Sequence, residues 1–233
     1  MHSDDEGDAG SLSRRVYEEL KRRLNEGSLR PGVFLDLGAL GRELGLSRTP
    51  LRDALIRLDL EGFIAIYPRR GVMVRALDLD EIRDIYEIVG ALEAQAAMSA
   101  GKHFGIAPSA LMFEHDAAMR KALDNDDFSA YYDANLAFHE SWLRLCGNED
   151  LVQTVRLKKE RLYDFPRREG YVREWELASV EEHREIAERF RSGDFAGAAA
   201  CIRDVHWSFE IQEPYIRAYY QAAARDAKAR ALE

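Results

Sequence analysis

The sequence predicts a mainly α-helical protein in which an N-terminal winged helix-turn-helix precedes a C-terminal, all-α antiparallel helical bundle. Apolar residues recur at three- and four-residue spacing along most of the chain, which is the period of a helix with one buried face. Two β-prone runs, at residues 63–67 and 72–74, flank a Pro-Arg-Arg-Gly turn typical of a hairpin. Beyond residue 77 the strand signals disappear, so packed helices are expected there.

The N-terminal elements are expected in the order helix, helix, helix, hairpin. A first helix is predicted over about 12–24, where apolar residues follow every fourth position, and a second over about 37–44. A third opens at Ser47 or Thr49 and closes at Gly62. Either hydroxyl can cap it, and the proline that follows is tolerated in a first turn whose amides lack helical partners.

The C-terminal part is predicted to contain six helices joined by short connections. Breaks rich in glycine, proline and asparagine separate the helical patterns. The predicted helices span residues 78–101, 108–123, 127–146, 149–168, 173–192 and 195–226. Short connections favour antiparallel packing of successive helices.

Charge divides the chain of 233 residues, whose net charge is −9, into parts of opposite sign. Residues 11–76 hold 13 Lys and Arg against 8 Asp and Glu, whereas residues 77–233 hold 20 against 30. We therefore expect a disordered acidic tail over 1–10, a DNA-binding domain over 11–76 and a helical domain over 77–233. Because salt screens charges beyond about 10 Å, an acidic total does not exclude nucleic-acid binding by the basic part.

Composition also excludes several classes of protein. The sequence has no apolar run near the roughly 18 residues that a membrane span needs, so no membrane partner is expected. The first ten residues carry four acids and lack the apolar segment of a signal peptide, which predicts a cytoplasmic protein. Two cysteines, Cys146 and Cys201, are too few for a disulfide scaffold or a Cys-rich zinc site.

A pattern of some forty residues stands out in the N-terminal part. It begins with a Gly-x-Leu-x-Pro-Gly turn at residues 27–32 and leads to Ser-Arg-Thr-Pro at residues 47–50, the start of the third helix. It ends with a Glu-Gly-Phe at residues 61–63 and a wing at residues 68–72. The pattern resembles that of the GntR-type transcriptional regulators of bacteria. This resemblance implies a DNA-binding regulator, expected to be a repressor, and no enzyme.

Shorter motifs mark the C-terminal part. They are Tyr86-Glu87, Leu92-Glu93, Phe138-His139, Gly147-Asn148, the run Glu-Glu-His-Arg-Glu-Ile at 181–186, Gly193-Asp194 and His206. Together they resemble the FCD type of effector domain that is found behind this kind of DNA-binding domain. The resemblance implies an effector-binding and dimerisation domain over residues 77–233.

The third helix carries the candidate DNA-reading residues. Arg48 and Arg52 lie four residues apart, hence on one helix face, where each can reach a guanine edge in the major groove. The hydroxyls of Ser47 and Thr49 suit phosphate oxygens. The resemblance assigns DNA contacts to these same four positions.

Other DNA contacts are expected from the wing and the second helix. The resemblance places the wing tip, here Arg70 and Gly71, in the minor groove. Where some relatives carry a basic residue in the second helix this chain has Gly38, so a contact from that helix is expected from Arg42. Because one such module binds weakly, we expect a homodimer on a near-palindromic, double-stranded operator.

Three histidines in three different predicted helices form the candidate metal site. A helical bundle can bring His139, His183 and His206 to one interior point, and Asn135 shares a helix face with His139. The resemblance implies that an acid or amide at the Asn135 position and these histidines bind a divalent metal. Zinc is the first choice and nickel an alternative. An aspartate is commoner at that position, so the amide is expected to weaken the site.

A metal with open positions can bind a small organic acid, which is the effector we expect. A nearby arginine would add a charge-assisted pair to the acid. Many relatives carry this arginine three residues before the Leu-Glu pair, but here the position is Val89. Arg156 and Arg161 on the middle helix are the candidates to replace it, and Tyr86 is a candidate to line the pocket.

Two alternative functions remain open at this point. The helical domain could form a metal-dependent hydrolase, since a metal can activate water, although the sequence offers no clear general base for it. Alternatively, the metal is purely structural and the protein binds its operator constitutively. The basic domain has no role in the hydrolase hypothesis.

Overall fold

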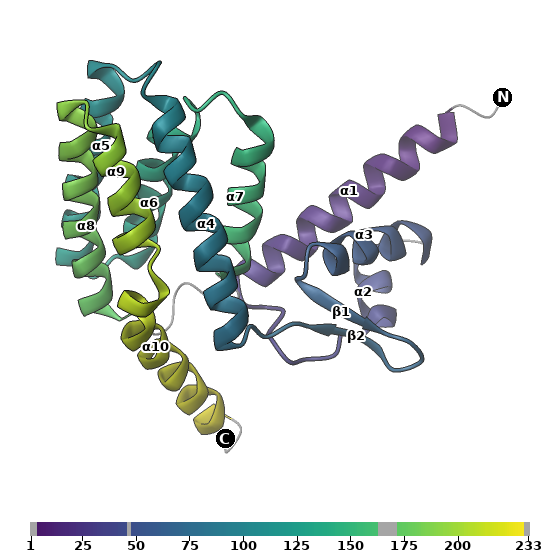
Figure 1. Ribbon diagram of the computed structural model, residues 1–233. Helices are drawn as coiled ribbons and strands as arrows, with labels where there is room; N and C mark the ends of the chain where they lie inside the picture. The colour runs from purple at the N-terminus through teal and green to yellow at the C-terminus, as the bar shows by residue number, and fades with distance from the viewer. Residues whose placement is uncertain (1–3, 46–47, 163–171, 231–233) are drawn as a thin grey trace. The chain divides into compact units, whose positions relative to one another are not determined.

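Helices make up nearly all regular structure in the computed structural model, which describes residues 4–45, 48–162 and 172–230 (Figure 1). One two-stranded hairpin is the sole sheet within these ranges. The predicted fold class, a winged helix-turn-helix followed by an all-α bundle, is confirmed. Among the described helices, none has an apolar stretch long enough to cross a bilayer.

The chain divides into two compact units near Asp78. The first unit contains the chain up to Asp78 and also the end of helix α7 (Glu149–Leu162) from Glu160. The second unit contains Leu79–Lys159 and the chain from residue 168, of which residues 172–230 are described. One helix therefore contributes residues to both units.

Three helices and the hairpin enclose the apolar core of the first unit. The elements are α1 (Asp4–Asn25), α2 (Leu37–Leu44), α3 (Arg48–Leu60), β1 (Ile64–Tyr67) and β2 (Gly71–Val74). Helix α1 packs against α3, and the hairpin follows α3 directly. The most deeply buried side chains of this core are Leu20, Leu58, Phe63 and Ile64.

Helix α1 begins at Asp4, so residues 4–10 are helical rather than the disordered tail that was expected. The apolar period in the sequence starts only at Leu12, and for this reason the sequence predicts a later start for the first helix.

Local capping fixes how the chain enters the DNA-reading helix. The Asp36 carboxylate accepts a hydrogen bond from the Ala39 N–H at 2.8 Å and so starts α2. Gly45 ends α2 in the left-handed conformation, with φ of 65°, which favours glycine. Helix α3 then buries Leu51, Ala54, Leu55 and Leu58 on one face, which leaves the opposite face exposed.

The second unit is a bundle of helices (Figure 1). Its elements are α4 (Leu79–Ala100), α5 (Ile106–Asp124), α6 (Phe128–Leu143), α7, α8 (Arg173–Ser192), α9 (Phe195–Cys201), the π-helical turn η1 (Ile202–His206) and α10 (Phe209–Arg230). Helix α5 packs against α6 and α8, while α4 packs against α9 and η1. The largest fully buried side chains of this unit include Trp142, Tyr131, Phe138 and Phe190.

The single helix predicted over 195–226 is wrong, because η1 and a short break divide it into α9 and α10. In η1 the Trp207 N–H donates to the Ile202 carbonyl at 2.9 Å, five residues back instead of four. The Ser208 hydroxyl then accepts from the Ile211 N–H at 3.5 Å at the start of α10. Apolar spacing does not reveal one extra residue in a turn, so the sequence pattern looked continuous.

A glycine allows η1 to lie close to α4. A Cβ atom at Gly90 would lie 2.9 Å from the Cβ of Trp207, closer than side chains pack. The absence of a side chain at Gly90 therefore permits the approach that puts Trp207 against Tyr86, with ring centroids 5.1 Å apart. This contact sets the position of His206, the residue before Trp207.

Glu176 gives the bundle a pH-dependent stability that a variant can isolate. Burial raises the pKa of Glu176 from its ordinary value of 4.5 to about 7, against a hydrogen bond from the Tyr131 hydroxyl that lowers it. Between these two values the folded chain holds a proton that the unfolded chain has lost. The free energy of unfolding therefore falls as pH rises from about 4.5 to about 7, by about 1 to 3 kcal/mol at most.

Glu176→Gln should remove this loss, so that the variant gains stability over the wild type at pH 8 but not at pH 4.5. Urea unfolding at several pH values measures the difference. Glu174→Gln, on the exposed side of the same first turn, is the matched control. Its free energy of unfolding should change with pH as that of the wild type does. If the free energy of unfolding of Glu176→Gln also changed with pH as that of the wild type does, Glu176 would be ionised in the folded protein.

Candidate metal centre and nucleic-acid interface

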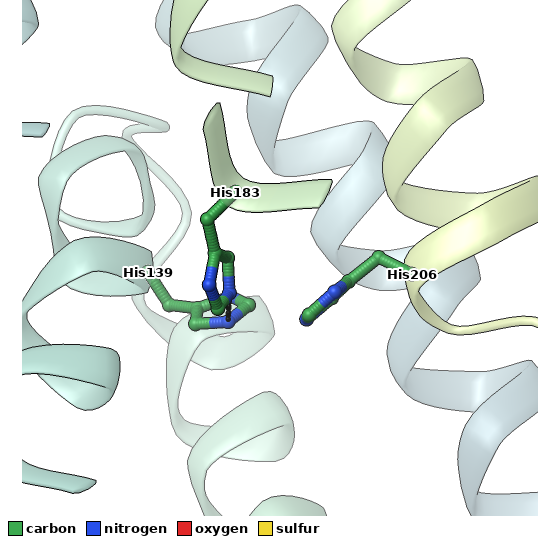
Figure 2. A group of neighbouring side chains, drawn as sticks. All are labelled: His139, His183 and His206. Carbon is green, nitrogen blue, oxygen red and sulfur yellow. Dashed lines mark hydrogen bonds between the residues drawn. The ribbon is translucent and has the colours of Figure 1, made fainter. Parts of the chain in front are cut away.

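Three histidine side chains meet inside the second unit (Figure 2). His139 comes from α6, His183 from α8 and His206 from η1, and Figure 2 shows the rings pointing toward one another. The Nε2 atoms of His139 and His183 lie 3.2 Å apart, and one nitrogen of each ring lies within 4.8 Å of the others. The three histidines that the sequence predicted to meet are thus close together, each from a different helical element.

Glu93 of α4 fixes the orientation of His139. The Nδ1 atom of His139 lies 2.7 Å from Glu93 Oε2, which also accepts from the Trp207 Nε1–H at 3.1 Å. Lys159 Nζ of α7 donates to the other carboxylate oxygen, Oε1, at 3.0 Å. Because Nδ1 carries the proton that this carboxylate accepts, the Nε2 lone pair of His139 faces the other two histidines.

A second carboxylate supports His206 in the same way. Glu182 Oε2 lies 2.8 Å from His206 Nδ1, and its other oxygen accepts from Gln212 Nε2 at 3.0 Å. Burial acts to raise the pKa of Glu182, but the hydrogen bond and charge of His206 outweigh it and lower the pKa. Two of the three histidines thus have a carboxylate at Nδ1, the arrangement that orients imidazoles bound to metals.

Electrostatics keep the cluster in a form that can bind a cation. Burial lowers the pKa of His139 to about 4, against the opposing charge of Glu93. Burial and the neighbouring histidines lower the pKa of His183 well below its ordinary value. Burial acts to raise the pKa of Glu93, but the opposite charges beside it, including Lys159, hold that pKa low. At pH 7 both rings are therefore neutral donors beside an ionised carboxylate.

The donor set and its spacing fit a divalent metal. Two imidazole nitrogens bound to one zinc ion at about 2.0 to 2.1 Å lie about 3.3 Å apart in tetrahedral geometry, close to the separation of His139 and His183. His183 Nδ1 is buried and has no hydrogen-bond partner among the described residues, so Nε2 is its end in the cluster. Three imidazole nitrogens bound to one ion would leave at least one metal position open.

Asn135, the expected fourth ligand, lies one turn before His139 on α6. Asn135 is half-buried, and its Nδ2 donates to the Tyr131 hydroxyl at 3.5 Å. Tyr131, Asn135 and His139 share one face of α6 at four-residue spacing. With Nδ2 turned to Tyr131, the carbonyl oxygen Oδ1 is the atom of the amide that suits a cation.

The expected effector residues lie in three different places. The guanidinium of Arg156 pairs with Glu140 at 2.6 and 2.8 Å on the exposed side of α7. Arg161 belongs to the first unit, where its guanidinium lies about 3 Å from the Cβ position of Gly62. Tyr86 alone is close to the cluster, through its ring contact with Trp207.

Sequence reasoning missed the residues that support the histidines. They are Glu93, Lys159, Glu182, Trp207 and Gln212. The Leu-Glu pair and the Glu before His183 were visible as motif residues, but no pattern in a single sequence shows which charged residue is buried. No motif or spacing in the sequence pointed to Lys159.

The described candidate DNA-binding side chains of α3 lie on its exposed face. Arg48, Thr49 and Arg52 are exposed on α3, opposite its buried face. Neither Arg48 nor Arg52 takes part in an ion pair within the part of the chain that the structure describes. Ser47 lies outside the described residues. The face therefore offers cationic donors that no neighbouring carboxylate has neutralised.

The second helix and the wing add further exposed groups. Arg42 is exposed in the last turn of α2. The hairpin pairs Ile64 with Val74 and Tyr67 with Gly71, which leaves Arg70 at the exposed tip. Gly71 has φ of 111°, a conformation that residues with a side chain rarely adopt.

Known proteins match both parts of the chain. The model of the bacterial regulatory proteins of the gntR family matches residues 12–74, and the FCD domain matches residues 84–206. An HTH-type transcriptional regulator in an unstable DNA locus of Streptomyces ambofaciens is 30% identical over 202 residues, 83% of this chain and 82% of that protein. The HTH-type transcriptional repressor GlaR of Escherichia coli K12 is 24% identical over 86% of this chain and 90% of its own.

Solved structures share the fold. Escherichia coli McbR/YncC superimposes with a TM-score of 0.64 at 23% identity, covering 90% of this chain and 97% of its own. A transcriptional regulator GntR from Rhodococcus sp. RHA1 gives a TM-score of 0.65 at 20% identity, covering 90% and 99%. With a DNA-binding motif, a helical effector domain and relatives that regulate transcription, the chain belongs to the GntR family of bacterial regulatory proteins and carries an FCD domain.

Proposed function

We propose that this regulator is a ligand-responsive repressor, which binds a near-palindromic operator as a homodimer in the cytoplasm and senses a small organic acid at a metal in its FCD domain. The observation that carries the proposal is the meeting of three imidazoles, two of which have a carboxylate at Nδ1. Family membership makes the chain a transcriptional regulator, which sets aside the hydrolase alternative.

The metal would be held by His139, His183 and His206, with zinc as the first choice and nickel as the alternative. The spacing of the Nε2 atoms and the two carboxylates behind the rings support this assignment. Asn135 is the proposed fourth ligand through Oδ1. A neutral amide binds more weakly than the carboxylate of an aspartate, so exchangeable positions remain for an organic acid.

DNA recognition is assigned to the exposed groups of the first unit. Arg48 and Arg52 would read base edges, and Ser47 and Thr49 would position α3 on the phosphates. Arg42, Arg70 and Gly71 are proposed to contact the flanking backbone and the minor groove. Exposure and the lack of neutralising carboxylates at Arg48 and Arg52 support the assignment.

An effector can control operator binding only if its affinities for two conformations of the dimer differ. An effector changes operator affinity only by as much as it prefers one conformation of the dimer over another, which is typically about 1 to 3 kcal/mol. A metal that serves only to hold the fold together would give no such coupling. DNA binding by the first unit and metal binding by the second can therefore be tested independently.

Arg52→Ala should weaken specific operator binding by about 1 to 3 kcal/mol, because it removes a bidentate contact to a base. Fluorescence anisotropy on an operator fragment, at fixed salt, measures the change. Arg144→Ala is the matched control, since it removes an exposed charge from the second unit. Equal affinities for Arg52→Ala and the wild type would refute the role of α3 in recognition.

His183→Ala should reduce the bound metal from one ion per chain to nearly none, because it removes a fully buried donor from the centre of the cluster. Metal analysis of the purified protein gives the stoichiometry, and His103→Ala on the exposed surface serves as control. Circular dichroism after chelation then decides the role. A retained fold with lost effector response supports a sensor, whereas an unfolded chain supports a structural ion.

A further inference from the structure

Lys159 is a buried cation beside the histidine cluster that neither DNA binding nor metal ligation uses. Its side chain on α7 is only 6% exposed, and its Nζ lies 3.0 Å from Glu93 Oε1 and 5.2 Å from the ring centroid of Trp207. A buried ammonium is rare in proteins unless a partner compensates its charge. Its position next to the cluster therefore needs an explanation.

The hydrogen-bonding capacity of Lys159 is only partly used. An ammonium group has three N–H donors, and Glu93 Oε1 is the one acceptor that the described residues provide. The other oxygen of Glu93 already accepts from His139 and Trp207. Among the described residues, two donors of Lys159 thus have no acceptor, and an acceptor from a bound ligand could use them.

The charge balance of the site indicates the sign of that acceptor. Glu93 and Glu182 each contribute one negative charge and Lys159 one positive charge to the groups around the histidines. A divalent ion on the neutral imidazoles would leave one positive charge in excess. Because an uncompensated charge is costly in a buried environment, a monoanion is the ligand that balances it.

The other cations of α7 do not provide this charge. Arg156 is paired with Glu140 on the exposed side, and Arg161 belongs to the first unit. Val89 of α4 is buried and apolar. Among the described residues, Lys159 is the cation in contact with the network that holds the histidines.

We propose that Lys159 anchors the carboxylate of the effector beside the metal. This inference rests on the proposed function and assigns the ligand class as a small monocarboxylate. One carboxylate function would occupy an open metal position and accept a hydrogen bond from Lys159 Nζ. A lysine binds a carboxylate as a flexible point charge, so Lys159 can keep its bond to Glu93 while it donates to the ligand.

The test is a titration of cobalt(II)-loaded protein with acetate, followed by the visible absorption of the metal. Lys159→Met keeps the length of the side chain and removes the charge, so acetate affinity should fall by about 10- to 100-fold. Lys159→Arg should stay within about threefold of the wild type. Imidazole, a neutral ligand for the metal, should bind all three proteins equally.

Two further measurements keep the outcomes distinct. The double variant Glu93→Gln with Lys159→Met removes both charges of the buried pair, and it replaces Lys159→Met if that variant does not fold. Equal acetate affinity in a folded, cobalt-loaded protein without the ammonium would overturn the proposal and leave Lys159 as the partner of Glu93. If the wild type binds no cobalt, the proposed metal centre fails instead. Acetate binding measured by calorimetry without metal then decides whether Lys159 still holds a carboxylate.

Discussion

The carboxylate of Glu93 is the interaction on which the second unit depends. It is fully buried, and its two oxygens join side chains of three other elements: His139 of α6, Lys159 of α7 and Trp207 after η1. An ionised carboxylate in the interior is tolerated only when such partners satisfy it. The same bonds that compensate this charge therefore set the relative positions of α4, α6, α7 and η1, and with them the geometry of the cluster.

In both units, packing holds polar side chains in place and leaves part of their hydrogen-bonding or metal-binding capacity unused. In α3 the apolar face is buried, and on the other face Arg48 and Arg52 have no carboxylate partner among the described residues, whereas Arg57 pairs with Glu61. In the bundle, Glu93 and Glu182 occupy Nδ1 of His139 and His206, which leaves the Nε2 atoms of these two imidazoles for the cluster. Both places therefore offer groups that the fold orients but does not saturate.

Much of this could be predicted from the sequence, because the signals were local. Apolar spacing and caps located most helices, the Pro-Arg-Arg-Gly turn located the hairpin, and the family pattern located the three histidines. The π-helical turn was missed since it changes a hydrogen-bond register without changing the apolar pattern. The pair of Glu93 and Lys159 was missed since it joins residues 66 positions apart. The ion pair of Arg156 with Glu140 was not foreseen either, because helix periodicity alone does not determine which neighbours a side chain meets.

The π-helical turn also affects how the histidine cluster can be lost in related proteins. Each residue of an α-helix rotates the chain by about 100° about the axis, so an ordinary helical turn in place of η1 would aim the imidazole of His206 at a different neighbour. A one-residue deletion in this short stretch would detach a donor while every histidine stayed in the sequence. Counting the residues between motifs is therefore as informative as identifying them when ligand sets are transferred among related chains.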